Sequence, residues 1–244
     1  MPAAGSPAGR AFLAEADRLS SAVSAVSAET GAAFARPSPC PPWTAGELLC
    51  HITGAVGRLS HMLAEPEPEP EPEPGPEPGR AGQLVSALGY YRPDHRFSPD
   101  TNADRIATAQ RGASRVAAGD LAADFARAGR EAWALVRAAP PGRVVRTRHG
   151  DLMLLTEFLR TRVVELAAHG LDLATALNRD PWLTAQAAAV IEDLVLPPGA
   201  APVIRERLGW DRATLIAALT RRRPLTAAES GLLAAHGVRW LALG

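Results

Sequence analysis

The chain has 244 residues, 47% of them hydrophobic, and its 26 Lys and Arg balance its 26 Asp and Glu. This composition supports a substantial core and excludes wholesale disorder. Zero net charge argues against a general nucleic-acid binder, which needs a positive surplus. The two cysteines, Cys40 and Cys50, form no CxxC motif, and we see no convincing signal peptide and no apolar run long enough to span a membrane. We therefore expect a cytoplasmic protein without a disulfide framework or membrane contact.

Apolar runs without proline predict the helices of the first half. Residues 10–34 read as a helix that the segment RPSPCPPW ends, because proline lacks an amide donor. Thr44 followed three residues later by Glu47 is a capping-box pattern, so a second helix is expected at about 44–64. From residue 65 to 79 glutamate and proline alternate, which favours an extended, solvated loop inserted within the domain.

The second half is predicted to continue the helical pattern. Residues 84–99 read as irregular, and residues 101–138 as one helix interrupted near Gly119 or as two helices. A connector follows, with a brief extended stretch at residues 144–145, and Asp151 is a candidate cap for a helix that runs to about Leu177.

These elements predict a mainly α fold. We expect a helical bundle at residues 1–180, with the Glu/Pro-rich insertion at 65–80. Residues 181–244 would form a small C-terminal subdomain, helical or α+β, with two or three shorter helices.

Four ionisable residues lie among the apolar residues of the helix expected to end near Leu177. Arg162, Glu165, His169 and Asp172 follow at offsets of three, seven and ten, which places them along one line of a helix. Glu165 and His169, one turn apart, can converge on one metal ion. His51 is the best candidate for a third ligand, since it lies among inward-facing residues of the 44–64 helix. Two histidines and one carboxylate leave coordination positions for water or substrate, as in catalytic zinc sites.

Spacing alone leaves other interpretations open. A Glu–His pair one turn apart is more often a solvated contact, and His51 alone is more often a hydrogen-bonded core histidine. Arg162 fits an ordinary ion-pair partner of Glu165, and Asp172 fits either a residue that orients a histidine or a local cap. Cys40, set among prolines, is better explained as a packed residue than as a nucleophile.

Three separated segments, in order, resemble one known family. CPPWTAGELLCHITG resembles the C-P-G-W-T-x-x-x-L-x-x-H motif of the mycothiol-dependent maleylpyruvate isomerase family, in the DinB-like superfamily. RVVELAAHGLDLATAL is similar to that family's R-x-x-E-x-x-x-H-x-x-D helix, and the segment from Leu219 to the C-terminus is similar to the family's tail. The resemblance covers most of the chain, and the Glu/Pro-rich insertion is the main departure.

The resemblance implies a DinB-like four-helix bundle that binds a divalent metal, commonly zinc, through His51, Glu165 and His169. It also implies mycothiol, a small bacterial thiol, as cosubstrate. The family uses an arginine in an L-T-G-R stretch for catalysis, and here the matching residues are LTRR, so Arg222 aligns with it. The glycine is replaced by Arg221, which leaves the choice among Arg221, Arg222 and Arg223 open.

The implied activity is metal-dependent and uses the thiol for cis–trans isomerisation of a small unsaturated organic acid, or for S-transfer to it. Arg58 and the run Tyr90, Tyr91 and Arg92 are candidates for binding substrate or thiol, since Tyr and Arg suit an anionic acid. An aromatic cluster that anchors the loop is the alternative for that run. The rival functions are a non-catalytic protein that sequesters a metal, a thiol or a small molecule, and a structural bundle with a decayed site.

Overall fold

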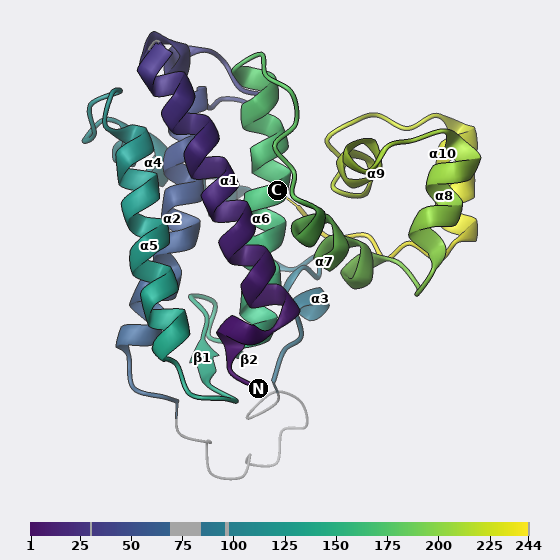
Figure 1. Ribbon diagram of the computed structural model, residues 1–244, viewed down its shortest axis with the longest axis horizontal. Coiled ribbons are helices and arrows are strands. Elements are labelled where there is room, and N and C mark those ends of the chain that lie inside the picture. The colour runs from purple at the N-terminus through teal and green to yellow at the C-terminus, as the bar shows by residue number, and fades with distance from the viewer. Residues whose placement is uncertain (30, 69–83, 96–97, 244) are drawn as a thin grey trace.

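The computed structural model describes residues 1–29, 31–68, 84–95 and 98–243, and it is built around a bundle of four long helices (Figure 1). These helices are α1 (Pro7–Glu29), α2 (Ala45–Ala64), α5 (Leu121–Ala138) and α6 (Leu155–Ala176). α1 and α2 each pack against both α5 and α6, so the four surround one core. Phe12, Phe125 and Phe158 lie fully buried in it. The predicted mainly α fold, a bundle with a small C-terminal appendage, is confirmed.

Local sequence signals set several helix boundaries correctly. The capping box predicted at Thr44 is present: its side chain accepts from the Glu47 amide, and the Glu47 carboxylate accepts from the Thr44 amide at 2.7 Å. α1 ends at Glu29, earlier than the expected residue 34, and the 3-10 helix η2 (Gly31–Ala35) follows it. At the N-terminal end of α1, the 3-10 helix η1 (Ala3–Gly5) precedes it.

The middle of the chain follows the second of the two predicted arrangements. Residues 101–138 form two helices, α4 (Pro99–Ala113) and α5, and α4 packs on the outside of α2. The segment expected to be irregular contains a short helix, α3 (Ala87–Tyr90), whose first turn is capped by the side chain of Ser86. The extended loop predicted at 65–80 lies mostly outside the described residues.

A small hairpin leads into α6. Strands β1 (Val144–Arg146) and β2 (Leu152–Leu154) pair antiparallel, which confirms the extended stretch expected at 144–145. The prediction that Asp151 caps the following helix is wrong. Residues 152–154 pair with β1 before the helix begins, so the residue in the cap position is Leu154, without a side-chain bond.

The C-terminal region contains more helices than expected. Residues 181–243 form α7 (Ala185–Val195), α8 (Ala200–Leu208), α9 (Arg212–Leu219) and α10 (Ala227–Ala235), where two or three were predicted. α7 packs on α1 and α6, and α8, α9 and α10 form a lobe beside the bundle (Figure 1). α9 joins this lobe to α7 and α6. The chain then returns to the bundle, where the Ala242 amide donates to the carbonyl of Tyr91. The proposed domain division at 180/181 stays a prediction.

The described helices were also compared with the requirements for a membrane span. None of them is long and apolar enough by itself. The pair α7 and α8 meets the length and composition requirement only when taken together, and it is bent by 104°.

Candidate metal centre

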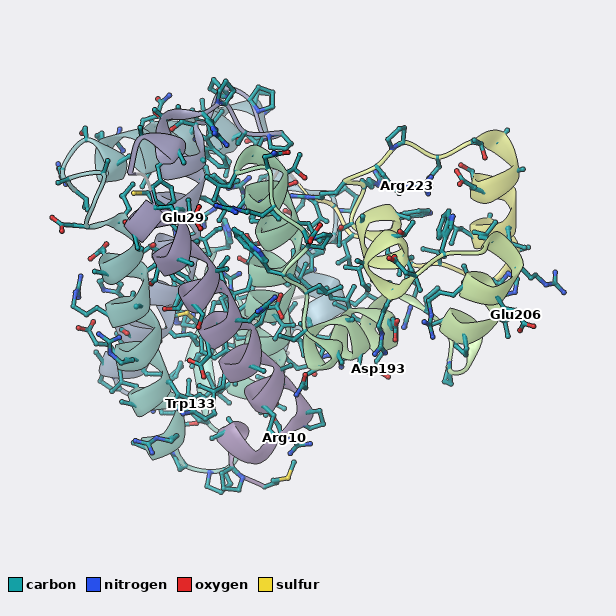
Figure 2. The ribbon with its side chains drawn as sticks, turned by 45° about the horizontal axis from the view of Figure 1, so that its top comes forward. Arg10, Glu29, Trp133, Asp193, Glu206 and Arg223 are labelled. Carbon is teal, nitrogen blue, oxygen red and sulfur yellow. The ribbon has the colours of Figure 1, made fainter. Side chains whose placement is uncertain are left out.

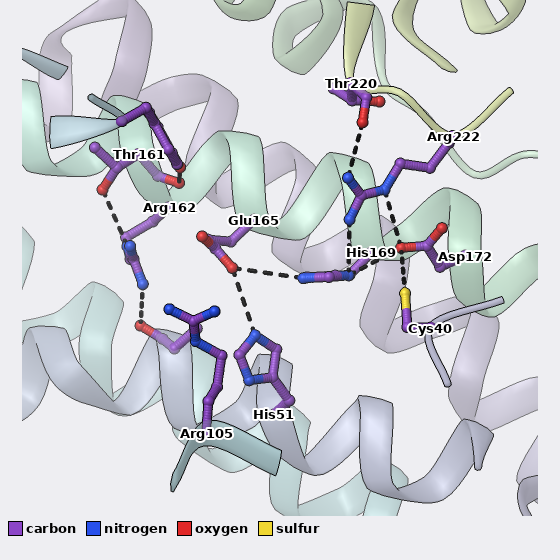
Figure 3. A network of polar contacts seen from close by, with 12 residues as sticks. Cys40, His51, Arg105, Thr161, Arg162, Glu165, His169, Asp172, Thr220 and Arg222 are labelled. Atoms are coloured by element: carbon purple, nitrogen blue, oxygen red, sulfur yellow. Dashed lines mark hydrogen bonds and ion pairs between the residues drawn. The ribbon is translucent and has the colours of Figure 1, made fainter. Parts of the chain in front are cut away.

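Three side chains converge on one point inside the bundle (Figure 3). They come from two helices that are far apart in the sequence but pack together. His51 projects from α2, and Glu165 and His169 project from α6, one turn apart. Glu165 Oε2 lies 3.6 Å from His51 Nε2 and 3.7 Å from His169 Nε2. The three candidate ligand atoms all lie within 4.8 Å of one another.

This donor set fits a divalent metal ion. Metal bonds of about 2.0–2.1 Å in a tetrahedral arrangement place neighbouring ligand atoms about 3.3 Å apart, close to the separations between Glu165 and the two histidines. Two imidazole nitrogens and one carboxylate oxygen are the ligand types that zinc accepts. The three residues predicted as ligands are therefore brought together in a geometry that small side-chain movements would close.

Asp172 fixes the orientation of His169. Its Oδ2 lies 2.9 Å from His169 Nδ1, and Arg222 Nε donates to the same oxygen at 3.1 Å. Arg222 Nη2 also lies 3.4 Å from His169 Nδ1. Nδ1 cannot accept from Arg222 while it donates to Asp172, and the shorter contact to a carboxylate is the stronger. We therefore assign the proton to Nδ1, which leaves the lone pair on Nε2 directed at Glu165.

His51 is held between an aromatic ring and the carboxylate. The Trp43 ring stacks on the imidazole with 4.7 Å between ring centroids, and Trp43 is itself buried. Burial lowers the pKa of His51 to about 4, although the hydrogen bond with Glu165 opposes this shift. His51 is therefore neutral at pH 7, the protonation state that ligates metals.

The carboxylate is held as an anion. Burial raises the pKa of Glu165, but the hydrogen bond from His51 and the positive charge of Arg162 outweigh burial and hold the pKa well below its usual range. Arg162 is itself buried; its Nε donates to the hydroxyl of Thr161 and its Nη1 to the carbonyl of Ala55. Arg162 thus lies beside the site as a fixed positive charge, with no ion pair of its own to Glu165 among the described contacts.

Cys40 forms a second cluster with His169 and Asp172, and we do not assign a metal to it. The thiol donates to Asp172 Oδ2 at 3.2 Å. The guanidinium of Arg222 contacts the same carboxylate, and its positive charge would repel a metal ion there. Burial and the charge of Asp172 raise the pKa of Cys40 to about 12, so at pH 7 it is a thiol and a poor nucleophile.

The candidate centre opens into a cavity of about 580 Å³. The whole chain is neutral, but the cavity wall is not. Among the described residues, it contains three carboxylates against six arginines, namely Arg58, Arg105, Arg148, Arg162, Arg221 and Arg222. The six arginines outnumber the three carboxylates, so the wall carries an excess of positive charge even with His51 neutral. This excess favours an anionic ligand.

The candidate binding residues on α2 and near α3 are placed differently from one another. Arg58 lines the cavity, where burial and the charges of Arg148 and Arg162 lower its pKa to about 10. Tyr90 and Tyr91 also line it, and the Tyr91 hydroxyl donates to the carbonyl of Thr161 at 2.9 Å.

Arg92, the fourth of these candidates, is not brought to the cavity wall. It pairs with Asp94 at 3.0 Å and Asp151 at 3.5 Å instead. Tyr90 and Tyr91 face the cavity. Arg92 instead points toward Asp151, in the turn between β1 and β2.

The three consecutive arginines after α9 also separate. Arg222 reaches into the bundle, donating to Asp172 and, through Nη1, to the carbonyl of Thr220 at 2.8 Å (Figure 3). Arg221 lies at the exposed rim of the same cavity. Arg223 remains in the lobe (Figure 2). There it pairs with Glu229 and lies over the ring of Trp210.

Two arginines of the cavity wall, Arg105 and Arg148, were not predicted from the sequence. Arg105 comes from α4 and points toward His51 and Glu165 (Figure 3). Arg148 comes from the turn between β1 and β2. Neither stands in a motif, and α4 has few buried residues from which its inner face could be predicted. Only the packing of α4 against α2 places Arg105 at the site.

Comparison with known families agrees with this architecture. A family model described as the mycothiol maleylpyruvate isomerase N-terminal domain matches residues 12–174, more than half of the chain. The chain belongs to this family. The match runs from α1 to the end of α6 and therefore includes both stretches that supply the three candidate ligands. A search of curated proteins and a search of solved structures each gave no match.

Proposed function

We propose that this protein is a divalent-metal-dependent enzyme that uses a low-molecular-weight thiol of the mycothiol type. Its substrate would be a small unsaturated organic acid, which it isomerises from cis to trans or converts to a thiol conjugate. The convergence of His51, Glu165 and His169 on a cavity wall is the observation that carries this proposal. Family membership supports the thiol and the isomerisation, and the positive charge of the wall supports an acid as substrate.

In this proposal, one group of residues binds the metal cation and another binds the carboxylates of the substrate or thiol. His51, Glu165 and His169 would bind the metal, commonly zinc in such donor sets, with Asp172 orienting His169 and Arg162 keeping Glu165 ionised. Bound there, the metal would act as a Lewis acid and lower the pKa of a bound thiol, so that the thiol would be ionised at neutral pH. Arg222 uses two of its five N–H groups on Asp172 and Thr220, and the others are available for a carboxylate of substrate or thiol.

The proposed reaction returns the thiol unchanged. The thiolate sulfur adds to one carbon of the double bond, and the displaced electron pair moves onto the conjugated carbonyl oxygen. Rotation about the resulting single bond follows, and the pair then re-forms the double bond and expels the thiolate. If the enolate takes a proton instead, the product is the thiol conjugate. We expect this chemistry in the cytoplasm, where a small thiol stays reduced.

Turnover tests the enzyme against sequestration. Zinc-loaded protein is incubated with mycothiol and maleylpyruvate, and the trans isomer and conjugate are quantified by chromatography. Product in large excess over protein, dependent on the thiol, is the expected result. Saturation at one equivalent would instead identify a binding protein, and the absence of both would reject the proposal.

Loss of one ligand should remove the metal without unfolding the bundle. His51→Ala is expected to weaken zinc binding by at least about 100-fold, because a ligand contributes more than the outer contacts whose loss costs 10–100-fold. Helix content should be retained, since alanine is the best helix former. His61→Ala, an exposed histidine on the same helix, is the matched control and should keep its zinc. Elemental analysis and circular dichroism measure both; full zinc in His51→Ala would reject the three-ligand centre.

A further inference from the structure

Four helices of this protein end in the same backbone motif. After α6, α8, α9 and α10, one residue adopts a left-handed conformation, and its amide and the next amide bond back to the last turn of the helix. This is the Schellman motif, in which the left-handed position strongly favours glycine and tolerates asparagine. The residues at that position are Asn178, Gly209, Arg221 and Gly237.

Arg221 is the exception among the four. Its φ is +60°, its amide donates to the carbonyl of Ala218 at 3.1 Å, and the next amide donates to Ala217 at 2.7 Å. A side chain with a Cβ is strained in this conformation, and arginine lacks the short polar group that lets asparagine adopt it. Glycine would therefore suit this position better for stability. Strain that is retained at one position of a fold points to a role for the side chain.

The guanidinium of Arg221 is held at the rim of the cavity. It lies over the ring of Trp240, 5.3 Å from the ring centroid, on the segment that returns from the lobe to the bundle. Arg221 lines the cavity beside Arg222, which is engaged with Asp172. Among the described residues, the Arg221 guanidinium makes no hydrogen bond and no ion pair, so its N–H groups are available to a ligand.

A cation near a helix C-terminus has a second possible use, which is to interact with the helix dipole. Arg222 and Arg223 follow α9 at once and already supply positive charge near its end. The two explanations predict opposite results when the side chain is removed. Stabilisation by the dipole would make a glycine variant less stable, whereas strain retained for binding would make it more stable.

We propose that Arg221 is a specificity-determining residue that binds a carboxylate of the ligand at the mouth of the cavity. This inference rests on the proposed function, because it takes the ligand to be a small organic acid. The Trp240 ring holds the guanidinium in place, and the left-handed backbone directs the side chain to the rim. The strained backbone at Arg221 thus places a second anion-binding group at the rim of the cavity. The first, Arg222, lies deeper in the cavity beside Asp172.

Thermal unfolding of the full chain tests the strain. Arg221→Gly is expected to raise the midpoint of unfolding by about 2–4 °C, the shift that relief of left-handed strain gives in a chain of this length. Asn178→Gly is the matched control at the same motif of α6, and it should change the midpoint by less than about 1 °C because asparagine tolerates the conformation. Arg221→Ala keeps the Cβ and should not gain stability. A lower midpoint for Arg221→Gly would overturn the proposal.

Binding of unreactive acids tests the contact without involving turnover. Succinate and butyrate differ in one carboxylate, and calorimetry on the zinc-loaded protein measures the preference for succinate. Arg221→Ala and Arg221→Gly should each reduce that preference by about 10-fold, the lower end of the contribution of one hydrogen bond between charged groups. Arg221→Lys should retain part of it, and Asn178→Gly should retain all of it.

These measurements separate this inference from the proposed reaction. A wild-type protein that binds both acids equally, or variants that keep the full preference for succinate, would overturn the role of Arg221. A preference that depends on Arg221 in a protein without thiol-dependent turnover would support the binding site and reject the reaction.

Discussion

Two carboxylates inside the bundle, in different surroundings, have opposite pKa shifts. Glu15 of α1 is 3% exposed, and the side chain of Glu165 in α6 is 20% exposed. Burial raises both pKa values. Near Glu15 the bonds from Thr184 and the charge of Arg18 are too weak to offset burial, and the pKa rises to about 7. Near Glu165 His51 and Arg162 outweigh burial, and the pKa falls well below its usual range.

The groups that contact each carboxylate therefore decide whether the effect of burial on its pKa is offset. Glu15 accepts from the Thr184 amide at 2.9 Å and thereby connects α1 to the start of α7, a structural contact. Glu165 is kept ionised between the imidazoles of His51 and His169. An anionic carboxylate and neutral imidazoles are the protonation states that bind a metal cation. The same residue type therefore serves the fold in one region and a candidate metal centre in the other.

The largest effect is expected when the ionised carboxylate is replaced. Glu165→Gln should weaken zinc binding by at least about 100-fold, because a neutral amide replaces an anionic ligand. Glu157→Gln is the control on the same helix, where Glu157 accepts from the Ala87 amide outside the cavity. Competition with a zinc chelator measures both affinities. Equal affinity in the two variants would show that Glu165 is not a ligand.

Replacement of the other carboxylate should change stability with pH instead. Glu15 has a folded-state pKa of about 7 against 4.5, so the folded protein binds the proton more tightly than the unfolded chain does. The contribution of Glu15 to the free energy of unfolding is therefore fully present below pH 4.5 and is lost as the pH rises through 7. Between pH 4 and pH 8, Glu15→Gln should gain up to about 3 kcal/mol of unfolding free energy relative to wild type.

Urea denaturation at the two pH values measures this difference. Glu131→Gln is the control, since Glu131 is exposed and pairs with Arg127 on the surface of α5. Its stability relative to wild type should stay constant within about 0.5 kcal/mol. A Glu15→Gln variant that behaves like this control would mean that Glu15 is not perturbed by burial.

Local sequence patterns predicted the parts of the site that lie along single helices. The capping box at Thr44 fixed the start of α2, and the spacing on α6 placed Glu165 and His169 on one face. His51 was predicted as the third ligand because it lies on the inward-facing side of its helix, and the family motifs supported that choice. No local pattern, however, shows that α2 and α6 pack together.

Contacts between distant segments escaped prediction for the same physical reason. Asp151 was predicted to be a helix cap, but pairing between β1 and β2 moves the helix start to Leu155. The contact between Cys40 and Asp172 joins residues 132 positions apart. Arg105 reaches the cavity only through the packing of one helix on another. Each depends on tertiary structure, which overrides local preference.

A third carboxylate, Asp172, sharpens the comparison because it contacts both the imidazole of His169 and the guanidinium of Arg222. Asp172→Asn should weaken zinc binding by about 10-fold, since His169 would lose the acceptor that fixes its Nδ1 proton. Asp193→Asn, at an exposed ion pair with Arg160, is the control and should leave zinc affinity unchanged. Chelator competition measures each variant.

Arg222→Gln then separates the two partners of Asp172. If Asp172 acts on the metal through His169, removing the neighbouring guanidinium leaves the imidazole oriented and takes away a positive charge near the metal. Zinc affinity should then stay the same or increase by about twofold, the effect of a screened charge. A decrease equal to that of Asp172→Asn would show instead that Asp172, His169 and Arg222 act as one unit, and that the lobe is needed to form the centre.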